Sequence, residues 1–319
     1  MSARSLLASM LAALATVGCA AGVEPETPAA LDEGALGVAP PAASAGQFGF
    51  TTLDVGQGDA AVVVTPGGCA ALLDAGPSGS GATIKQYLRS IGIARLDFAV
   101  VSHYHADHLG GLDEVERGDD AVPIARVYDH GGAYDTATYA EYERQFRGRR
   151  ATAARGQAIS LCGEVTLHVV ASNANGAPTT DENARSVVVK VSYGALDVLV
   201  GGDLGVSGPN VESMIAADVG PVEVYKVHHH GSAGSSGAPF LDTIRPTVGF
   251  ISAAASNSYG HPAPSALARL AAVGAAVWRT EPAAVSERGH LELTTPAGED
   301  GAIFKIAQRG RSAVYRSHP

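Results

Sequence analysis

Three histidines and an aspartate lie within six residues of one another in the segment 103–108 (HYHADH). The apolar run 96–101 precedes this segment and predicts a short buried strand. In an extended chain His103 and His105 point to the same side, and the Asp-His pair after them turns the corner beside them. Imidazole and carboxylate groups that converge at a strand end can ligate one or two divalent metals. The pattern therefore predicts a metal site rather than a run of surface histidines.

The composition of the 319-residue chain is that of a folded protein, with 46% hydrophobic and 17% charged residues. Its net charge of -10 argues against a protein that coats long nucleic acid through bulk electrostatics. One segment is locally basic, and its arginines are either a solvated helix end or an insertion that contacts substrate phosphates. These arginines are Arg144, Arg147, Arg149, Arg150 and Arg155.

The N-terminus has the pattern of an export signal. Arg4 precedes the apolar run 6–17, which is too short to span a bilayer as a mature helix. The segment 16–19 (TVGC) resembles a bacterial lipobox, although the usual Leu is absent from the third position before Cys19. We therefore expect residues 1–19 to be a signal peptide and lipobox, with ordinary secretion or an uncleaved anchor as alternatives. A lipid anchor at Cys19 would make the chain a cell-envelope lipoprotein, periplasmic or outer-surface.

Residues 20–47 are rich in Ala, Pro, Glu and Gly, which is typical of a flexible tether. The folded domain is then expected over 48–319. Two cysteines in it, Cys69 and Cys162, would meet an oxidising compartment after export. A disulfide between them and two isolated buried thiols both remain open.

Apolar strands and amphipathic helices alternate through this domain, which predicts an α/β fold with helices on the outer faces of its sheets. Strands are expected over 48–54, 60–64, 69–73, 96–101, 122–128, 164–171, 186–193, 196–201, 222–227, 247–252, 275–279 and 291–295. Helices are expected over 83–90, 112–116, 138–146, 210–217, 239–244 and 265–273. Polar clusters follow strands at 103–108, 203, 228–230 and 261. Active sites of layered α/β proteins gather at strand ends, so these clusters predict one shared site.

The His-x-His-x-Asp-His motif at 103–108 resembles the signature of the metallo-β-lactamase superfamily. Asp74, Asp203 and the histidines after 222–227 match further acidic and histidine positions of that superfamily. More specifically, the chain resembles the hydrolase domain of ComEC-type DNA-uptake proteins. The motifs that carry this resemblance are LDVGQGD at 53–59, LDAG at 73–76, KVHHHGS at 226–232 and YGHP at 259–262. The resemblance implies a four-layer αββα sandwich with a metal site at the edge shared by the two sheets.

The resemblance also implies a ligand set. His103 and His105 would hold one ion, while Asp107, His108 and His229 would hold a second and Asp203 would bridge them. Mixed His/Asp ligation suits one or two Zn²⁺ ions and tolerates Mn²⁺. A shifted register would make His228 the ligand instead of His229.

Other residues would surround these ligands. His230 would support a ligand or contact the substrate, and Ser232 and Ser236 could donate hydrogen bonds to phosphate. Asp54 and Asp59 are expected to fix turns and to hold ligand histidines from behind.

A further histidine that normally completes the first metal site of the superfamily is missing here. Of the intervening histidines, His130 lies in a Gly-rich loop and is expected to be peripheral. His168 lies in the middle of a strand and is expected to be a core or sheet-face residue. The sequence offers Asn183 and Ser186 at the expected place. The first site should therefore be weak, completed by water or empty.

These residues lead to the hypothesis of an exported, metal-dependent hydrolase, a phosphodiesterase or nuclease that uses a metal-activated water. Asp107 or Asp203 would orient the nucleophile, and His261 would protonate the leaving group or contact phosphate. The expected partners are a phosphodiester such as DNA and a membrane bound through the lipid anchor, with no protein partner. One alternative is hydrolysis of another extracellular ester, such as a phosphorylcholine ester, lactone or β-lactam. A second alternative is a metal-poor binding lipoprotein on the same fold.

Overall fold

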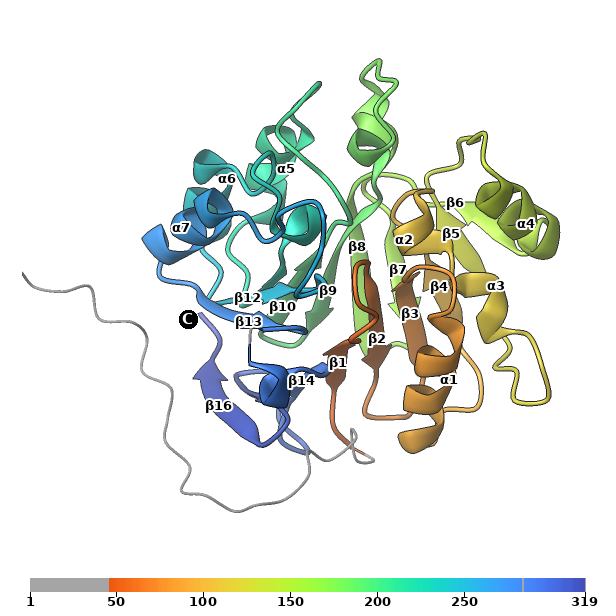
Figure 1. The fold of residues 1–319 in the computed structure, drawn as a ribbon. Coiled ribbons are helices and arrows are strands. Elements are labelled where there is room, and N and C mark those ends of the chain that lie inside the picture. The colour runs from red at the N-terminus through yellow and green to blue at the C-terminus, as the bar shows by residue number, and fades with distance from the viewer. Residues whose placement is uncertain (1–45, 283, 319) are drawn as a thin grey trace, which may run out of the picture.

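The computed structural model describes residues 46–282 and 284–318. The predicted signal peptide and lipobox, and the predicted tether up to residue 45, lie outside the described residues. Two mixed β-sheets pack face to face, and helices cover the outer face of each (Figure 1). Within the described ranges, no helix combines the length and the apolar character that a membrane span needs. The α/β sandwich predicted from the sequence is confirmed.

The first sheet contains nine strands among the described residues, in the order β16-β15-β14-β1-β2-β3-β4-β5-β6. The strands from β3 to β6 run parallel, and the other neighbours are antiparallel. Their bounds are β1 Gly49–Thr52, β2 Ala60–Val64, β3 Ala70–Ala75, β4 Phe98–Val100, β5 Val127–Asp129, β6 Arg150–Thr152, β14 Leu291–Thr294, β15 Ile303–Gln308 and β16 Arg311–Arg316.

The second sheet contains seven strands among the described residues, in the order β13-β12-β11-β10-β9-β8-β7. The strands from β10 to β13 run parallel, so their carboxyl ends lie at the same edge of the sheet. The bounds are β7 Ala158–Leu161, β8 Val165–Ala171, β9 Val188–Tyr193, β10 Leu196–Val200, β11 Val224–Lys226, β12 Val248–Ile251 and β13 Ala276–Arg279.

Helices form the two outer layers (Figure 1). Of the α-helices in the described residues, four lie against the first sheet, namely α1 Gly81–Ser90, α2 Ala106–Leu109, α3 Leu112–Val115 and α4 Ala137–Phe146. Three lie against the second sheet, namely α5 Val211–Val219, α6 Ala238–Ile244 and α7 Pro264–Ala272. Short 3-10 helices occupy η1 Asn173–Gly176, η2 Asn183–Arg185, η3 His228–Gly231 and η4 Val285–Glu287.

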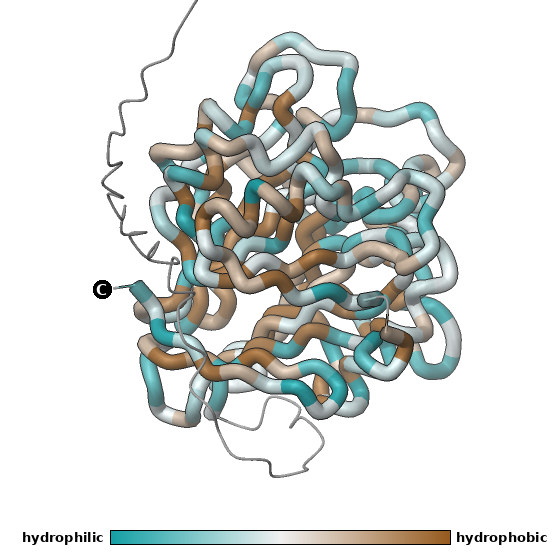
Figure 2. Tube along the Cα trace, turned by 60° about the vertical axis from the view of Figure 1, so that its left-hand side comes forward, coloured by the Kyte–Doolittle hydropathy of each residue, from teal (hydrophilic) through white to brown (hydrophobic). Residues whose placement is uncertain are grey.

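Three apolar clusters fill the three interfaces between these four layers. Strand β2 shows how its sequence builds two of them, because successive side chains of a strand point to opposite faces. Ala61 and Val63 join the cluster between the sheets, whereas Val62 and Val64 join the cluster beneath α1 to α4. A strand covered on both faces therefore reads as a continuous apolar run. Figure 2 shows such hydrophobic segments in the interior and hydrophilic ones at the loops.

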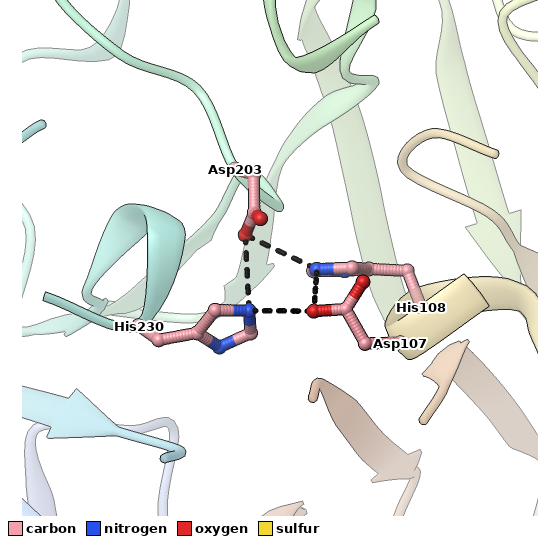
Figure 3. A group of neighbouring side chains, drawn as sticks. All are labelled: Asp107, His108, Asp203 and His230. Atoms are coloured by element: carbon pink, nitrogen blue, oxygen red, sulfur yellow. Dashed lines mark ion pairs between the residues drawn. The ribbon is translucent and has the colours of Figure 1, made fainter. Parts of the chain in front are cut away.

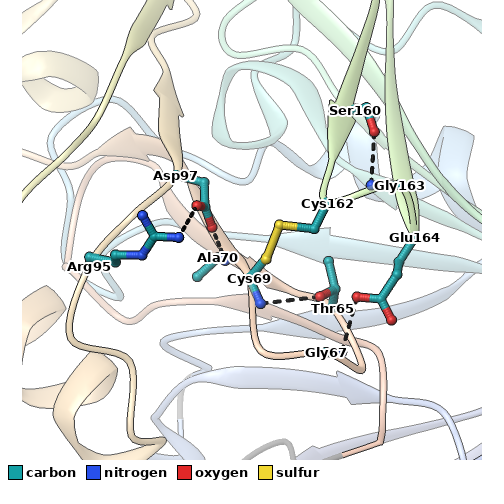
Figure 4. The surroundings of a disulfide bond; sticks show 10 residues. All are labelled: Thr65, Gly67, Cys69, Ala70, Arg95, Asp97, Ser160, Cys162, Gly163 and Glu164. Atoms are coloured by element: carbon teal, nitrogen blue, oxygen red, sulfur yellow. Dashed lines mark hydrogen bonds and ion pairs between the residues drawn. A yellow bond between two sulfur atoms is a disulfide. The ribbon is translucent and has the colours of Figure 1, made fainter.

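A disulfide joins Cys69, directly before β3, to Cys162, directly after β7, and so links the two sheets (Figure 4). The sequence allowed either this disulfide or two isolated thiols, and the structure contains the disulfide. The bond connects residues 93 positions apart, a separation for which loop closure stabilises a fold by about 4–5 kcal/mol in the chain-entropy account.

The sequence misses four strands. The elements expected from it stop at residue 295, whereas β15 and β16 continue the first sheet beyond β14. Strands β6 and β7 are also missed, because each is short and has polar residues among its apolar ones, so that no apolar run marks it. The strand expected over 122–128 is shorter and ends one residue later, at Val127–Asp129.

Candidate metal centre

The candidate site lies where strands of both sheets end. In the first sheet, β4 leads into the 103–108 segment, whose second half forms the start of α2. In the second sheet, β10 leads to Asp203 and β11 leads to the three histidines of η3. The polar clusters that the sequence places after separate strands therefore meet at one edge of the sandwich, as expected.

Asp107, His108, Asp203 and His230 form a cluster that we call the four-residue group (Figure 3). One ligand atom from each lies within 4.8 Å of the others. The His108 Nε2 lies 3.1 Å from Asp203 Oδ1 and 3.9 Å from Asp107 Oδ2. The His230 Nε2 lies 3.4 Å and 3.3 Å from the same two oxygens. Two imidazole nitrogens and two carboxylate oxygens thus face a common point.

Whether the four-residue group fits a metal ion can be judged from its polar atoms that make no hydrogen bond. Nε2 of His108, Nε2 of His230 and Oδ1 of Asp203 are buried, and none makes a hydrogen bond within the described part of the chain. The opposite nitrogen of each histidine is held from behind, since Nδ1 of His108 lies 2.9 Å from Asp74. Nδ1 of His230 lies 2.9 Å from the Ser252 carbonyl. Metal-ligating histidines are held in this way, so the residues fit a divalent ion.

Asp59 and Asp74 are the acidic residues behind the ligands. Asp74 accepts hydrogen bonds from the backbone and hydroxyl of Ser102, both at 2.7 Å, in addition to its contact with His108. Asp59 forms a buried ion pair with Lys226 at 2.7 Å and lies 3.2 Å from Nδ1 of His230. The predicted position of Asp59 behind a histidine is confirmed. Asp54 accepts a hydrogen bond from the amide of Gly56, which is the predicted turn contact.

His103, His105 and Asp203 form the three-residue group, which shares Asp203 with the first cluster. The Nε2 of His103 lies 3.0 Å from Nδ1 of His105. Behind His103 stands the Ser102 hydroxyl at 3.0 Å, which is a neutral partner instead of a carboxylate. His105 is half-buried, whereas His103 is fully buried. The shared carboxylate places Asp203 where a bridging ligand would lie.

The protein's own charges set opposite pKa shifts in the two groups. Burial alone would lower the pKa of His108 and His230, but Asp203 together with Asp74 or Asp59 outweighs it. The pKa of His108 is raised well above its usual value, and that of His230 is raised to about 10. In the three-residue group, burial and the charge of His108 hold the pKa of His103 well below its usual value. Although burial acts against ionisation, His230 and His108 hold the pKa of Asp203 well below its usual range.

The fold and this cluster agree with the comparisons to known proteins. The sequence profile described as Metallo-beta-lactamase superfamily matches residues 53–254. The chain belongs to the metallo-beta-lactamase superfamily. A solved structure of CmlA, a diiron β-hydroxylase from Streptomyces venezuelae, shares the fold, with a TM-score of 0.51 and 14% identity over 73% of this chain and 53% of that chain.

Two relatives are competence or recombination proteins. The chain is 30% identical over 246 residues to competence protein ComA of Neisseria gonorrhoeae, covering 76% of this chain and 32% of that protein. It is 29% identical over 236 residues to recombination protein 2 of Haemophilus influenzae, covering 72% and 27% respectively. The chain thus spans about a third or less of the length of these relatives. The resemblance to competence proteins inferred from the motifs is confirmed as a distant homology.

The last histidine of this superfamily site differs from the sequence-based assignment. The sequence predicts His229 as the ligand that shares an ion with Asp107 and His108. The structure brings His230 into this four-residue group instead. Both residues have positive φ, 51° and 54°, in the tight turn of η3. This turn leaves the His229 side chain 29% exposed, with Nε2 3.5 Å from the other oxygen of Asp203. The geometry therefore favours His230 as the ligand and His229 as its more exposed neighbour.

His228 faces away from the site. It is fully buried, and its Nδ1 lies 2.9 Å from Glu212. Its Nε2 lies against Gly201, where an added Cβ would come within 2.4 Å of that nitrogen. The alternative register that would make His228 a ligand is therefore wrong.

The predicted substrate-contacting serines differ in position. Ser232 is half-buried directly after η3, and its Oγ accepts a hydrogen bond from the Gly234 amide at 3.3 Å. Ser236 is fully buried, and its hydroxyl pairs with that of Tyr225 at 2.9 Å. Ser236 therefore supports the loop behind the site and does not reach the surface where a substrate would lie.

His261 borders the site beside His229 and His230, at ring-centroid distances of 5.4 and 6.2 Å. Burial and the two neighbouring histidines lower the pKa of His261 to about 4. Its ring is then neutral at pH 7. Of the two roles predicted for His261, a hydrogen bond to a phosphate oxygen suits this neutral form better than proton donation.

The structure gives His130 and His168 no place in either group. His130 is buried, with its Nε2 2.9 Å from Glu182, and His168 lies exposed on β8, paired with Ala158 and Lys190. The hydroxyl of Ser186 donates to the Asn183 carbonyl at 2.8 Å, and Oδ1 of Asn183 is buried without a hydrogen bond to the described residues. The three-residue group has one histidine or carboxylate ligand fewer than its neighbour.

The arginines of the basic segment 144–155 form ion pairs within the protein. Every one of its five arginines faces a carboxylate, which favours the solvated helix end over a phosphate-binding insertion. The pairs are Arg144–Glu141, Arg147–Glu143, Arg149–Glu116, Arg150–Asp129 and Arg155–Asp218.

Sequence reasoning missed several residues that hold the site. Ser102 bonds Asp74 and contacts His103, and its place directly before the motif is a signal that could have found it. Glu182 accepts from the Tyr104 amide and lies beside His130, while Glu212 holds His228. These two glutamates lie in a polar loop and on a helix, where nothing in the local pattern separates them from surface residues.

Proposed function

We propose that this chain is a metal-dependent phosphodiesterase that acts on nucleic acid at the cell envelope. The observation that carries the proposal is the four-residue group, in which two buried imidazole nitrogens, without hydrogen bonds to the described residues, face two carboxylates. The competence and recombination proteins among its relatives support nucleic acid as the substrate class.

The four-residue group would hold Zn²⁺, or Mn²⁺, through Asp107, His108, Asp203 and His230. A divalent ion held there would lower the pKa of a bound water toward about 7 and would polarise a phosphoryl oxygen. The three-residue group would hold a second, weaker ion.

Protein groups complete the proposed mechanism. Asp107 is the more exposed carboxylate of the group, with a third of its side chain accessible. Although burial opposes it, His230, whose Nε2 lies 3.3 Å away, and the charge of His108 lower the pKa of Asp107 to about 2. This carboxylate therefore stays ionised at neutral pH and can accept a hydrogen bond that orients the attacking water. Neutral His261, at the rim beside His229, can donate a hydrogen bond to a phosphate oxygen.

Two observations support an envelope location. The Cys69–Cys162 disulfide is typical of proteins from oxidising compartments. The first 19 residues read as a signal peptide with a lipobox-like Cys19. We propose that a lipid attached to Cys19 would anchor the chain to a membrane.

Hydrolysis assays on three substrates test the proposal. Bis(p-nitrophenyl) phosphate and single-stranded DNA represent phosphodiesters, and nitrocefin represents β-lactams. We expect hydrolysis of the two phosphodiesters by the Zn²⁺- or Mn²⁺-loaded protein and its loss in Asp203→Asn. Asp54→Asn is the matched control, because Asp54 serves a turn outside both groups. Hydrolysis of nitrocefin with neither phosphodiester cleaved would contradict the proposal.

A further inference from the structure

A continuous row of aromatic rings runs through the metal site and has a tyrosine at each end. Tyr259 stacks on His261 with ring centroids 5.7 Å apart, and Tyr134 meets the edge of His105 at 5.7 Å. Centroids of successive rings between these ends lie 4.3 to 6.2 Å apart. The intervening rings are those of His261, His230, His108, His103 and His105.

Tyr259 contributes little to the fold. Its side chain is 70% exposed and belongs to none of the three apolar clusters. Its hydroxyl makes no hydrogen bond to any residue in the described ranges. A large, mostly exposed ring beside the candidate metal site, whose hydroxyl makes no hydrogen bond to the described residues, is available to a ligand.

The loop that carries Tyr259 is nevertheless well ordered by one side chain. The Asn257 Oδ1 accepts hydrogen bonds from the amides of Tyr259 and His261, at 3.1 and 2.9 Å. Its Nδ2 donates to the carbonyls of Ala254 and His261, at 2.7 and 2.5 Å. A ring presented on a loop that is already fixed binds a ligand with little further loss of entropy.

Tyr134 occupies the other end in a different way. It is half-buried in the loop between β5 and α4, where it packs against the core beneath the helices of the first sheet. The ring of Tyr134 also contacts the ring of His105 in the three-residue group. The two tyrosines therefore border different halves of the metal centre.

We propose that Tyr259 and Tyr134 are positioning residues that stack on nucleobases on the two sides of the phosphodiester to be cleaved. This inference rests on the proposed function. Aromatic stacking suits a chain with a net charge of -10, whose clustered arginines are already paired with carboxylates. Stacking needs an exposed base face and tolerates any base, so the substrate segment must be unpaired and its sequence matters little.

Steady-state kinetics of the metal-loaded full chain test the inference on two oligonucleotides. One is dT12, and the other has the same backbone with abasic sites at every position. We expect Tyr259→Ala to raise KM for dT12 about tenfold, since stacking on one base is worth that order of affinity, with kcat changed less than about twofold. Tyr134→Ala should shift KM in the same direction. Tyr259→Phe keeps the ring face and should behave like the wild type, as should Met214→Ala, which shortens another exposed apolar side chain.

The abasic oligonucleotide separates stacking from backbone contacts. Its KM should be the same for the wild type and Tyr259→Ala, because it has no base to stack. Equal shifts for both oligonucleotides, or no shift for either, would overturn the inference.

Binding without turnover separates this inference from the proposed function. Fluorescence anisotropy with a phosphorothioate dT12, which resists hydrolysis, should show binding that Tyr259→Ala weakens about tenfold. If no phosphodiester is hydrolysed but this loss of binding appears, the proposed reaction fails while the base contact stands. If phosphodiesters are hydrolysed but Tyr259→Ala binds dT12 as tightly as the wild type, the base contact fails while the proposed reaction stands.

Discussion

The two halves of the metal centre share Asp203 but differ in what stands behind their histidines. In the four-residue group, His108 is held by Asp74, and His230 lies beside Asp59 and the Ser252 carbonyl. In the three-residue group, the partner behind His103 is the neutral hydroxyl of Ser102. A carboxylate behind an imidazole fixes its orientation and raises its basicity, and a hydroxyl does this less. From this difference we expect the four-residue group to bind a metal ion more tightly than the three-residue group.

The largest effect is expected from Asp203→Asn, because this residue belongs to both groups. Its loss should reduce metal-dependent hydrolysis by more than about 100-fold, beyond what removal of an outer hydrogen bond costs. Metal content after dialysis should fall for both ions. An Asp203→Asn protein that keeps one tightly bound ion would show that the two groups are independent.

The next effect concerns the carboxylate behind His108. Asp74→Asn keeps the shape of the side chain and an oxygen that can accept from Ser102, but it removes the charge facing His108. We expect the affinity for Zn²⁺ to fall about 10- to 100-fold, measured by competition with a chelator. Asp97→Asn, at the opposite end of β4, is the control and should leave the affinity unchanged. Equal losses in both variants would point to general destabilisation.

The pH dependence of metal binding should separate the halves further. Because the pKa of His230 is raised to about 10 and that of His108 is raised as well, both carry a proton at pH 7 in the metal-free protein. A metal must displace these protons, so affinity for the four-residue group should rise about tenfold per pH unit for each proton between pH 6 and 8. His103 is already neutral, because its pKa is lowered, and should release none. Calorimetry in two buffers of different ionisation enthalpy counts the protons released. An affinity for the first metal ion that does not change with pH would contradict this account.

The smallest effect is expected from His105→Ala in the weaker half. This half-buried ligand belongs only to the three-residue group. The second, weaker ion should be lost while the first is retained, with activity changed less than about tenfold, the low end for a peripheral metal contact. Loss of both ions in His105→Ala would reverse the ranking of the halves.

Much of this site could be predicted from local sequence. The 103–108 motif and Asp203 follow recognisable strands, and the parallel order of β10, β11 and β12 brings their ends together. The choice between His229 and His230 could not be predicted, because it depends on two successive residues with positive φ. His230 is held by contacts to Asp59 and Ser252, which are distant in the chain.

The same limit explains the basic segment and the missed strands. Five clustered arginines look available in the sequence, but each faces a carboxylate, and three of these carboxylates come from distant parts of the chain, such as Asp218 of α5 beside Arg155. Strands β15 and β16 gain their place by pairing with β14 and with each other, and the sequence signals this pairing weakly. Local pattern predicts elements, whereas long-range pairing decides which side chains remain free.

Metal content of three proteins tests the central claim most directly. Wild type, His229→Ala and His230→Ala would be purified alike, loaded with Zn²⁺, dialysed and analysed by mass spectrometry for bound metal. We expect at least one equivalent in the wild type and in His229→Ala, and much less than one in His230→Ala. A His230→Ala protein that retains its metal while His229→Ala loses it would contradict the assignment of His230 to the four-residue group.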